Sequence, residues 1–341
     1  MGQILCCWEI GAGYGHLYRL LPIISSFTAS GHRVTLISKN TDLTKTIYKS
    51  FNIGIIPAPT QSVPQKNFPL SQNYSQNLLR NGYWHSPSLR QHLKDWLAIY
   101  ETYQPDLVIA EHAPTALLAA KMMNLPRAVT GTGFSLPPQR VPMPGLQPWF
   151  TIPDRYLLKA EVEFLEILNP VIESLGGQAL KAVKEIFDQA EPFLCTFPEL
   201  DHYAVHESMK YLGPILYTPN HQLPKWPDCK GIPIFLYIHN ANRLLRPLLT
   251  LLKSLPVSVL AFISAMPKDE IQQWTGKNLR IVSHPVNLSE VSKHCQLMIS
   301  QGGMNTGAYM LLHGIPLFLL PLELEQMLWA YRLSQQGLAA T

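Results

Sequence analysis

The feature that most constrains the fold lies near the end of the sequence, at residues 297–320. An apolar run at 297–299 has the composition of a buried strand, and Gly302 and Gly303 follow it. A helical pattern then extends to Gly314, and a second apolar run begins at once. Strand, turn, helix and strand in this order form a βαβ unit, which requires a parallel sheet with a right-handed crossover. The sequence therefore predicts an α/β fold.

The turn that precedes this helix is suited to an anionic ligand. Gly302 and Gly303 allow close approach of a ligand to the backbone, and we expect Asn305 and Thr306 to cap the helix. The helix start offers unpaired N–H groups and the positive end of the helix dipole. These features are typical of a diphosphate site.

Two further polar residues, Glu325 and Gln326, follow the second strand of this unit. Open α/β sheets bind their ligands at the carboxyl ends of the strands, so we expect this pair near the same ligand. A carboxylate and an amide are good partners for the hydroxyl groups of a ligand. The alternative is that the pair is only the exposed first turn of a final helix.

A similar strand–helix–strand pattern opens the chain, with strands at residues 3–9 and 33–38 and a helix at 16–30. Its first loop contains three glycines: Gly11, Gly13 and Gly15. A dinucleotide-binding motif is excluded, because His16 stands where its last glycine belongs and residues 38–40 lack the usual acid. Further strands at 53–56, 107–110 and 127–130 extend this sheet, and residues 154–190 are predicted to be helical.

The two motifs together resemble the UDP-glycosyltransferase-like family 1 glycosyltransferases. Their donor signature reads His-Gly-Gly-x-Asn-Ser/Thr, then Gly-x-Pro, then Pro-x-x-x-Asp/Glu-Gln. The matching residues here are Gly302, Gly303, Asn305, Thr306, Gly314, Pro316, Pro321, Glu325 and Gln326. Gln301 replaces a phosphate-contacting His, and Tyr309 replaces a ribose-binding Glu. The resemblance implies the GT-B architecture, with two Rossmann-like lobes of parallel sheet around an interdomain cleft.

The resemblance also implies that His16, in a Gly-x-Gly-His loop, is the catalytic base. A loop His can take the proton from an acceptor hydroxyl, and such a base needs a carboxylate to orient it. Glu111 follows a predicted strand and is the expected partner, with Glu9 as its rival and His112 as a weaker one. On the structural alternative, Glu111 caps the helix that begins at Ala113, and His16 merely opens the first helix.

The domain organisation follows from a proline-rich stretch at residues 213–233, which holds five prolines and is predicted to be the linker. We expect an acceptor-binding lobe at 1–212 and a nucleotide-sugar-binding lobe at 234–341. Enzymes of the resembling family usually continue further, so we expect either a C-terminally truncated chain or a shortened second lobe. Loops with prolines and aromatic residues at 57–90 and 131–150 favour a partly apolar acceptor.

Composition excludes several other classes. A net charge of +4 without a Lys/Arg run gives no nucleic-acid surface, and no apolar segment is long enough to span a membrane. The five cysteines are scattered and odd in number, which favours a reducing compartment and hence a cytoplasmic protein. His202 and His206 have helical spacing but no third ligand, so no metal site is predicted.

The resemblance, together with these residues, implies an inverting, metal-independent glycosyltransferase of the hexosyltransferase type. Its donor would be a UDP- or dTDP-linked sugar, used as co-substrate without another cofactor, and its acceptor a small or lipid-like molecule. The donor-binding residues would be Gln301, Gly302, Gly303, Asn305, Thr306, Glu325 and Gln326. One alternative is a non-catalytic GT-B scaffold or partner subunit, which the changes at Gln301 and Tyr309 favour. A sugar-nucleotide epimerase is a third, for which the sequence offers no further cleft carboxylates.

Overall fold

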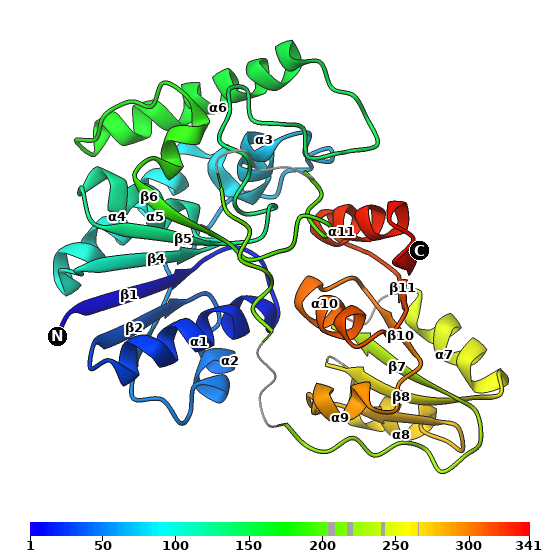
Figure 1. Cartoon of the computed structure of the whole chain (residues 1–341). Helices are drawn as coiled ribbons and strands as arrows, with labels where there is room; N and C mark the ends of the chain where they lie inside the picture. The colour runs from blue at the N-terminus through cyan, green and yellow to red at the C-terminus, as the bar shows by residue number, and fades with distance from the viewer. Residues whose placement is uncertain (204–208, 217–220, 240–242, 265) are drawn as a thin grey trace. The chain divides into compact units, whose positions relative to one another are not determined.

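The computed structural model describes residues 1–203, 209–216, 221–239, 243–264 and 266–341. The chain divides into two compact units, Met1–Ile215 and Leu216–Thr341. Each unit contains a six-stranded sheet whose neighbouring strands are parallel, with helices packed on it (Figure 1). The predicted α/β fold with two parallel-sheet lobes is therefore confirmed.

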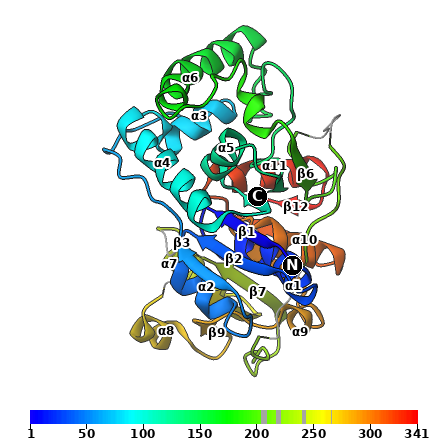
Figure 2. The same ribbon diagram turned by 90° about the vertical axis from the view of Figure 1, so that its left-hand side faces the viewer.

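The sheet of the first unit has the strand order β3-β2-β1-β4-β5-β6. The strands are β1 (Gln3–Trp8), β2 (Arg33–Ser38), β3 (Gly54–Pro57), β4 (Leu107–Glu111), β5 (Arg127–Gly131) and β6 (Ala190–Leu194). The α-helices are α1 (Gly15–Ala29), α2 (Thr41–Ile47), α3 (Tyr74–Leu78), α4 (Ser86–Tyr103), α5 (Pro114–Met122) and α6 (Asp154–Ser174). A π-helical turn, Leu79–Tyr83, and a 3₁₀ turn, Val183–Phe187, complete the unit, and α6 packs against α3 and α4 (Figure 2).

The edge strand β6 corrects the sequence prediction, which gave helices over residues 154–190 and no strand after them. Helix α6 ends at Ser174, and β6 pairs in parallel with β5. Glu191 and Pro192 interrupt its apolar pattern. A proline is tolerated there because an edge strand leaves one side of its backbone without a partner strand.

The two faces of the first sheet are covered by different helices (Figure 1). Trp8 and Cys6 of β1 pack in one hydrophobic cluster with α1, whereas Cys7 and Leu5 pack in another with α4 and α5. Successive side chains of a strand point to opposite faces, so alternate residues of β1 pack against different helices. Glu111 is the register partner of Trp8 and therefore belongs to the α1 face.

The sheet of the second unit has the order β12-β11-β10-β7-β8-β9. The strands are β7 (Ile232–Ile238), β8 (Val257–Ile263), β9 (Leu279–Val282), β10 (Leu297–Ser300), β11 (Leu317–Leu319) and β12 (Ala339–Ala340). The helices are α7 (Leu245–Ser254), α8 (Lys268–Trp274), α9 (Leu288–Ser292), α10 (Met304–Leu312) and α11 (Leu324–Gln335). Helices α10 and α11 meet where the Trp329 ring fills the space that a Cβ on Gly307 would occupy.

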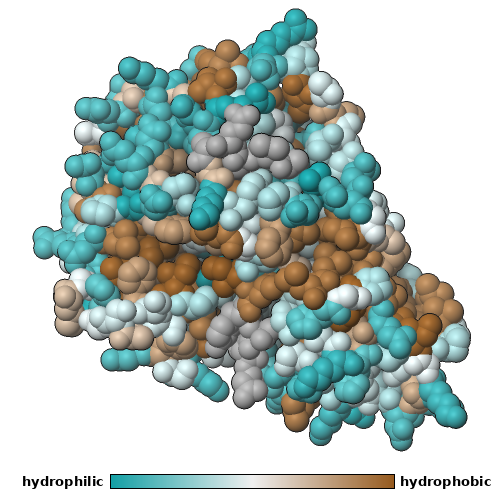
Figure 3. Space-filling model, in the orientation of Figure 1, coloured by the Kyte–Doolittle hydropathy of each residue, from teal (hydrophilic) through white to brown (hydrophobic). Residues whose placement is uncertain are grey.

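Hydrophobic side chains reach the surface as well as the cores (Figure 3). In the first unit, Val141 and Phe150 are 53% and 64% exposed, and both lie in the long connection between β5 and α6. In the second unit, Leu312 and Leu322 are exposed near the two ends of β11. Among the described residues, no helix is both long and apolar enough to cross a membrane.

Candidate active site

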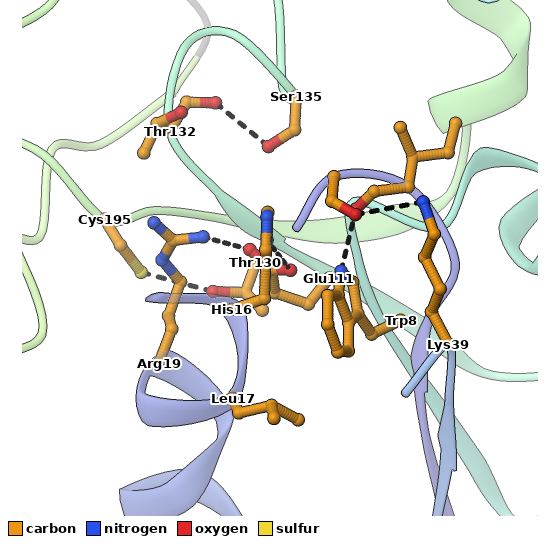
Figure 4. A network of polar contacts seen from close by, with 12 residues as sticks. Trp8, His16, Leu17, Arg19, Lys39, Glu111, Thr130, Thr132, Ser135 and Cys195 are labelled. Carbon is orange, nitrogen blue, oxygen red and sulfur yellow. Dashed lines mark hydrogen bonds and ion pairs between the residues drawn. The ribbon is translucent and has the colours of Figure 1, made fainter. Parts of the chain in front are cut away.

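The predicted base and its carboxylate meet at the carboxyl edge of the first sheet. His16 is the second residue of α1, and its Nδ1 lies 2.7 Å from Oε2 of Glu111, the last residue of β4. The other carboxylate oxygen, Oε1, accepts a hydrogen bond from the Arg19 guanidinium (Figure 4). Glu111 is fully buried, while the His16 side chain remains 12% exposed. The structure thus brings His16 and Glu111 together as expected.

The ionisation of Glu111 determines which nitrogen of His16 carries the proton. Burial by itself would raise the pKa of Glu111, but the neighbouring His16 and Arg19 more than offset it and lower that pKa to about 2. At neutral pH the carboxylate is therefore ionised and can only accept hydrogen bonds. His16 must then donate through Nδ1–H, which leaves the Nε2 lone pair of the neutral ring available to accept a proton.

Space beside Nε2 is provided by Gly11. This residue has a φ of +90°, and a Cβ added to it would meet His16 at Nε2 and at Cε1, the latter at 2.9 Å. Lys39 Nζ donates to the Gly11 carbonyl at 3.0 Å, and Trp8 Nε1 donates to the Ile10 carbonyl at 2.7 Å. The Trp8 ring also stacks on the His16 ring, with centroids 5.2 Å apart. The loop is thus held in place, and the absence of a side chain at Gly11 avoids a clash with His16 Nε2.

Gly11→Ala should therefore inactivate the site. We expect at least about a hundredfold loss of any activity that needs His16 as a base, because the new methyl group displaces the ring. Gly31→Ala is the matched control, since Gly31 also has a positive φ, +82°, but nothing lies within 4 Å of its added Cβ. Both variants should lose about 1–2 kcal/mol of stability from backbone strain. Equal activity in the two variants would contradict this role of Gly11.

The alternative partners of His16 are engaged elsewhere. Glu9 is buried on the opposite face, where its Oε1 accepts from Thr115 N at 2.7 Å and its Oε2 lies 3.7 Å from Nε2 of His92. Burial raises the pKa of Glu9 to about 7. The N-terminus of α5 is therefore capped by Glu9 rather than by Glu111.

His112, the other alternative partner, contacts the glycine loop through its backbone. Its carbonyl accepts from Ile10 N at 3.0 Å, which ties the glycine loop to the end of β4. Burial, with His16 as the next cause, lowers the pKa of His112 to about 3, so its ring is neutral at ordinary pH. Its centroid lies 5.7 Å from that of His16. Glu111, rather than Glu9 or His112, is hydrogen-bonded to the His16 ring.

Arg19 is the member of this site that the sequence prediction missed. It lies three residues after His16 on α1 and is only 5% exposed. Residues three apart on a helix lie on the same face, so the spacing from His16 was the available signal. An Arg in an otherwise apolar helix face has to be paired when it is buried.

The predicted phosphate loop of the second unit lies between β10 and α10. Gly302 has a φ of +90° and donates its N–H to Ser300 Oγ at 3.2 Å. Gly303 is the N-cap residue of α10, so the expectation that Asn305 and Thr306 cap the helix is wrong. Both residues lie inside the first helical turn. The start of α10 is consequently formed by a glycine, which leaves the approach to the backbone N–H groups free of a capping side chain.

Gln301 and Tyr309, the two departures from the resembling signature, have structural contacts of their own. Gln301 is 6% exposed, and its Oε1 accepts from His239 N at 3.0 Å, which ties the end of β10 to the end of β7. Tyr309 is 9% exposed and stacks on His313 with centroids 4.3 Å apart. Both side chains therefore take part in the packing of the second unit.

Glu325 and Gln326 belong to the first turn of α11. Gln326 forms a capping box with Glu323, and its Oε1 accepts from Leu322 N at 2.9 Å and from Glu323 N at 3.2 Å. The start of α11 lies next to the predicted phosphate loop, because a Cβ on Gly302 would be 3.4 Å from the Gln326 carbonyl oxygen. The structure therefore places Gly302 beside the backbone of Gln326, and the expectation that both lie near one ligand stays a prediction.

A metal ion needs several ligating side chains that lie close together. Among the described residues, no group of three or more His, Cys, Asp or Glu side chains is arranged to hold a metal ion. His202 Nδ1 lies 3.6 Å from Asp201 Oδ1, and its ring contacts Tyr203. His206 lies outside the described residues.

No protein-family model matches the sequence, and no curated protein does. Solved structures match closely in shape. CalG4, the calicheamicin glycosyltransferase, has a TM-score of 0.69 at 19% identity, over 99% of this chain and 85% of that one. Glycosyltransferase VinC in complex with dTDP has a TM-score of 0.67 at 16% identity, over 99% and 86%.

A third solved structure is the spinosyn rhamnosyltransferase SpnG with spinosyn aglycone, at a TM-score of 0.63 and 16% identity, over 100% of this chain and 86% of that one. The chain has the GT-B fold. This fold accounts for the two Rossmann-like units with parallel sheets. At identities of 16–19% the likeness is one of fold, so the chemistry of this GT-B chain has to be derived from its own residues.

Proposed function

We propose that this GT-B chain is an inverting glycosyltransferase that moves a sugar from a UDP- or dTDP-linked donor to a hydroxyl of a partly apolar acceptor. The observation that carries this proposal is the His16–Glu111 pair, in which Nδ1 contacts the buried carboxylate and Nε2 lies beside Gly11. A neutral imidazole held by an ionised carboxylate is a competent general base. The start of α10 is proposed to bind the donor, and apolar residues of the first unit are proposed to bind the acceptor.

In the proposed reaction, His16 Nε2 takes the proton of the acceptor hydroxyl as its oxygen attacks the anomeric carbon of the sugar. The new C–O bond forms while the bond from that carbon to the diphosphate breaks, and the diphosphate leaves with the bonding electrons. This single displacement inverts the anomeric configuration. The imidazolium that forms is stabilised by Glu111, whose low pKa keeps it ionised throughout.

The donor side of the proposal rests on the start of α10. Its backbone N–H groups and the positive end of its dipole suit a diphosphate, and they would stabilise the leaving group as negative charge develops on it. No metal ion is then needed for this step. Asn305, Thr306, Glu325 and Gln326 remain the proposed side-chain contacts of the donor. The solved structures of VinC and SpnG that hold dTDP support a nucleoside diphosphate as the ligand class.

The acceptor side rests on the first unit. The connection from β5 to α6 exposes Val141 and Phe150, and Trp84 and Phe68 lie with ring centroids 6.3 Å apart around Lys66. Apolar and aromatic surfaces of this kind fit an acceptor with an apolar body. SpnG, a protein of the same fold, is described with an aglycone bound. We therefore propose an acceptor of the aglycone or lipid-like class.

A thermal-shift titration tests this function. We expect UDP or dTDP and their glucose conjugates to raise the unfolding midpoint, with about 2.7 kcal/mol of stabilisation at a hundredfold excess over Kd, and GDP to have less effect. His16→Ala should show the same shift, whereas slow release of the sugar should occur only with His16 present. The absence of a shift with every nucleotide would contradict the proposal.

The competing function is a non-catalytic GT-B scaffold. It is favoured by the engagement of Gln301 with His239 and by the burial of Tyr309, since these positions would otherwise contact the donor in the resembling family. A scaffold would bind no nucleotide sugar, or bind it without releasing the sugar. The titration above therefore separates the two functions.

A further inference from the structure

Arg19 makes a contact that the proposed chemistry does not itself require. It shares the carboxylate of Glu111 with His16: His16 Nδ1 contacts Oε2, and the Arg19 guanidinium donates to Oε1. Both side chains come from α1, three residues apart, so one helix delivers both donors to a single carboxylate (Figure 4). Arg19 is 5% exposed and Glu111 is fully buried.

The contact at Oε1 constrains how the carboxylate can turn. The last torsion of a Glu side chain has a broad, roughly twofold profile, so a carboxylate held at one oxygen can rotate. A second donor on the other oxygen removes that freedom. With Oε1 held by Arg19, Oε2 stays directed at His16 Nδ1, and the ring is kept with Nε2 toward Gly11.

The same contact also adjusts the charge that His16 experiences. The Arg19 cation offsets much of the negative charge of Glu111 next to the His16 ring. Other charged or titratable groups face this pair from the neighbouring elements. His112 follows Glu111 on β4, Lys39 at the end of β2 holds the Gly11 carbonyl, and Glu9 lies on the opposite face against α5. Arg19 is the cation in direct contact with the carboxylate.

We propose that Arg19 is a positioning residue for the His16 base: by holding Oε1 of Glu111 it fixes the proton of His16 on Nδ1 and keeps Nε2 free. This inference rests on the proposed function, because it assigns Arg19 a part in that same reaction. Arg19 acts through Glu111 and touches no reacting atom. Its effect is therefore on the tautomer and the protonation of His16.

The first test reads the tautomer directly by the ¹⁵N chemical shifts of the His16 ring in the full chain, assigned by their loss in His16→Ala. In the wild type and in Arg19→Lys, which keeps the cation, we expect the Nδ1–H form to predominate at neutral pH. In Arg19→Gln and in Arg19→Met, which retains much of the packing volume, we expect a mixture of the two tautomers. An unchanged Nδ1–H form in a folded Arg19→Gln or Arg19→Met protein overturns the proposal. Failure of both neutral variants to fold also overturns it, in favour of a purely structural role.

The second test is the pH profile of sugar release from the donor identified by titration. Arg19→Gln should lower the rate about tenfold to a hundredfold, as expected for a misplaced base. It should also move the acid limb of the profile, because removal of the cation changes the charge beside the proposed base. A structural role alone would lower the rate equally at every pH, and that result would contradict the proposal.

The two tests separate failure of the inference from failure of the proposed function. If no nucleotide sugar is bound or cleaved, the proposed function fails, while the tautomer measurement still shows whether Arg19 controls His16. If sugar release occurs but neither the tautomer nor the acid limb responds to Arg19, the inference fails and the proposed function stands.

Discussion

Glu111→Ala should destabilise the first unit by about 3–5 kcal/mol, which would be the largest effect of any single side-chain truncation at this site. The reason is that the Arg19 guanidinium would remain buried after losing the carboxylate that accepts its hydrogen bond. Amide hydrogen exchange of peptides from β1 and β4 in the full chain would measure this loss for the first unit alone.

Glu163→Ala is the matched control for this prediction. Glu163, like Glu111, pairs with a cation: its Oε1 lies 3.8 Å from Nζ of Lys159 on the same helix. Both of these side chains are more than half exposed. Exposed pairs of this kind contribute about 0–1 kcal/mol, so exchange from the same peptides should change little. A Glu111→Ala protein as stable as the Glu163→Ala protein would show that Arg19 is not held as the structure indicates.

The stability of the protein should also depend on pH, because the contribution of Glu111 requires an ionised carboxylate. The folded-state pKa of Glu111 is depressed from its ordinary value of 4.5 to about 2, so its contribution is present above pH 4.5 and is lost as the pH falls toward 2. The difference in unfolding midpoint between wild type and Glu111→Gln should therefore shrink over that window. Glu9 has the opposite sign, because burial raises its pKa to about 7 and its ionisation costs stability between pH 4.5 and 7.

The central part of the fold could be predicted from hydrophobic patterning. The unit from β1 through α1 to β2 alternates a buried strand, a glycine loop and an amphipathic helix, and each of these has a clear periodicity. Strand β6 lacks such a signal, because Glu191 and Pro192 stand in it and only its position at the edge of the sheet makes them acceptable. Patterns reveal strands that are buried on both faces better than strands that complete an edge.

The pairing within the site could be predicted only in part, because it depends on which face of the sheet each side chain meets. Glu9 and Glu111 both stand at the end of a predicted strand, and no pattern in the sequence indicates the register between β1 and β4. In the structure Trp8 is the partner of Glu111, so Glu111 meets α1, while Glu9 is one residue further and meets α5. The alternation of side chains along the strands therefore determines which carboxylate contacts His16 and which one caps α5.

The start of α10 shows a different limit of sequence patterns. Asn305 and Thr306 are residue types that commonly cap helices, but Gly303 takes that position and the helix begins two residues earlier than expected. The positive φ of Gly302 turns the chain early, directly after β10. Backbone geometry at a glycine pair can therefore override the capping preference of the side chains that follow.

His16→Ala should abolish transfer while leaving the donor bound. Removal of a general base costs about 10²–10⁴-fold in rate, and we expect a loss in this range for sugar release and for transfer to any acceptor. The fold should survive, because the ring is partly exposed and Glu111 keeps its contact with Arg19. Steady-state rates with the donor in excess, together with the thermal shift produced by the same donor, would measure the two effects separately.

His32→Ala supplies the control for this substitution. His32 lies between α1 and β2, and its Nδ1 accepts a hydrogen bond from Gly2 N at 3.2 Å. This contact is at the amino end of β1, whereas His16 lies beyond its carboxyl end. Its removal should leave the rate within about twofold of the wild type, since this partly buried contact is remote from His16 and its loss should cost on the order of 0.5 kcal/mol. A His16→Ala protein that still transfers sugar at the wild-type rate would exclude His16 as the base. Loss of the thermal shift in that variant would instead place His16 in donor binding, because a base that acts only on the acceptor hydroxyl has no effect on the affinity for the nucleotide.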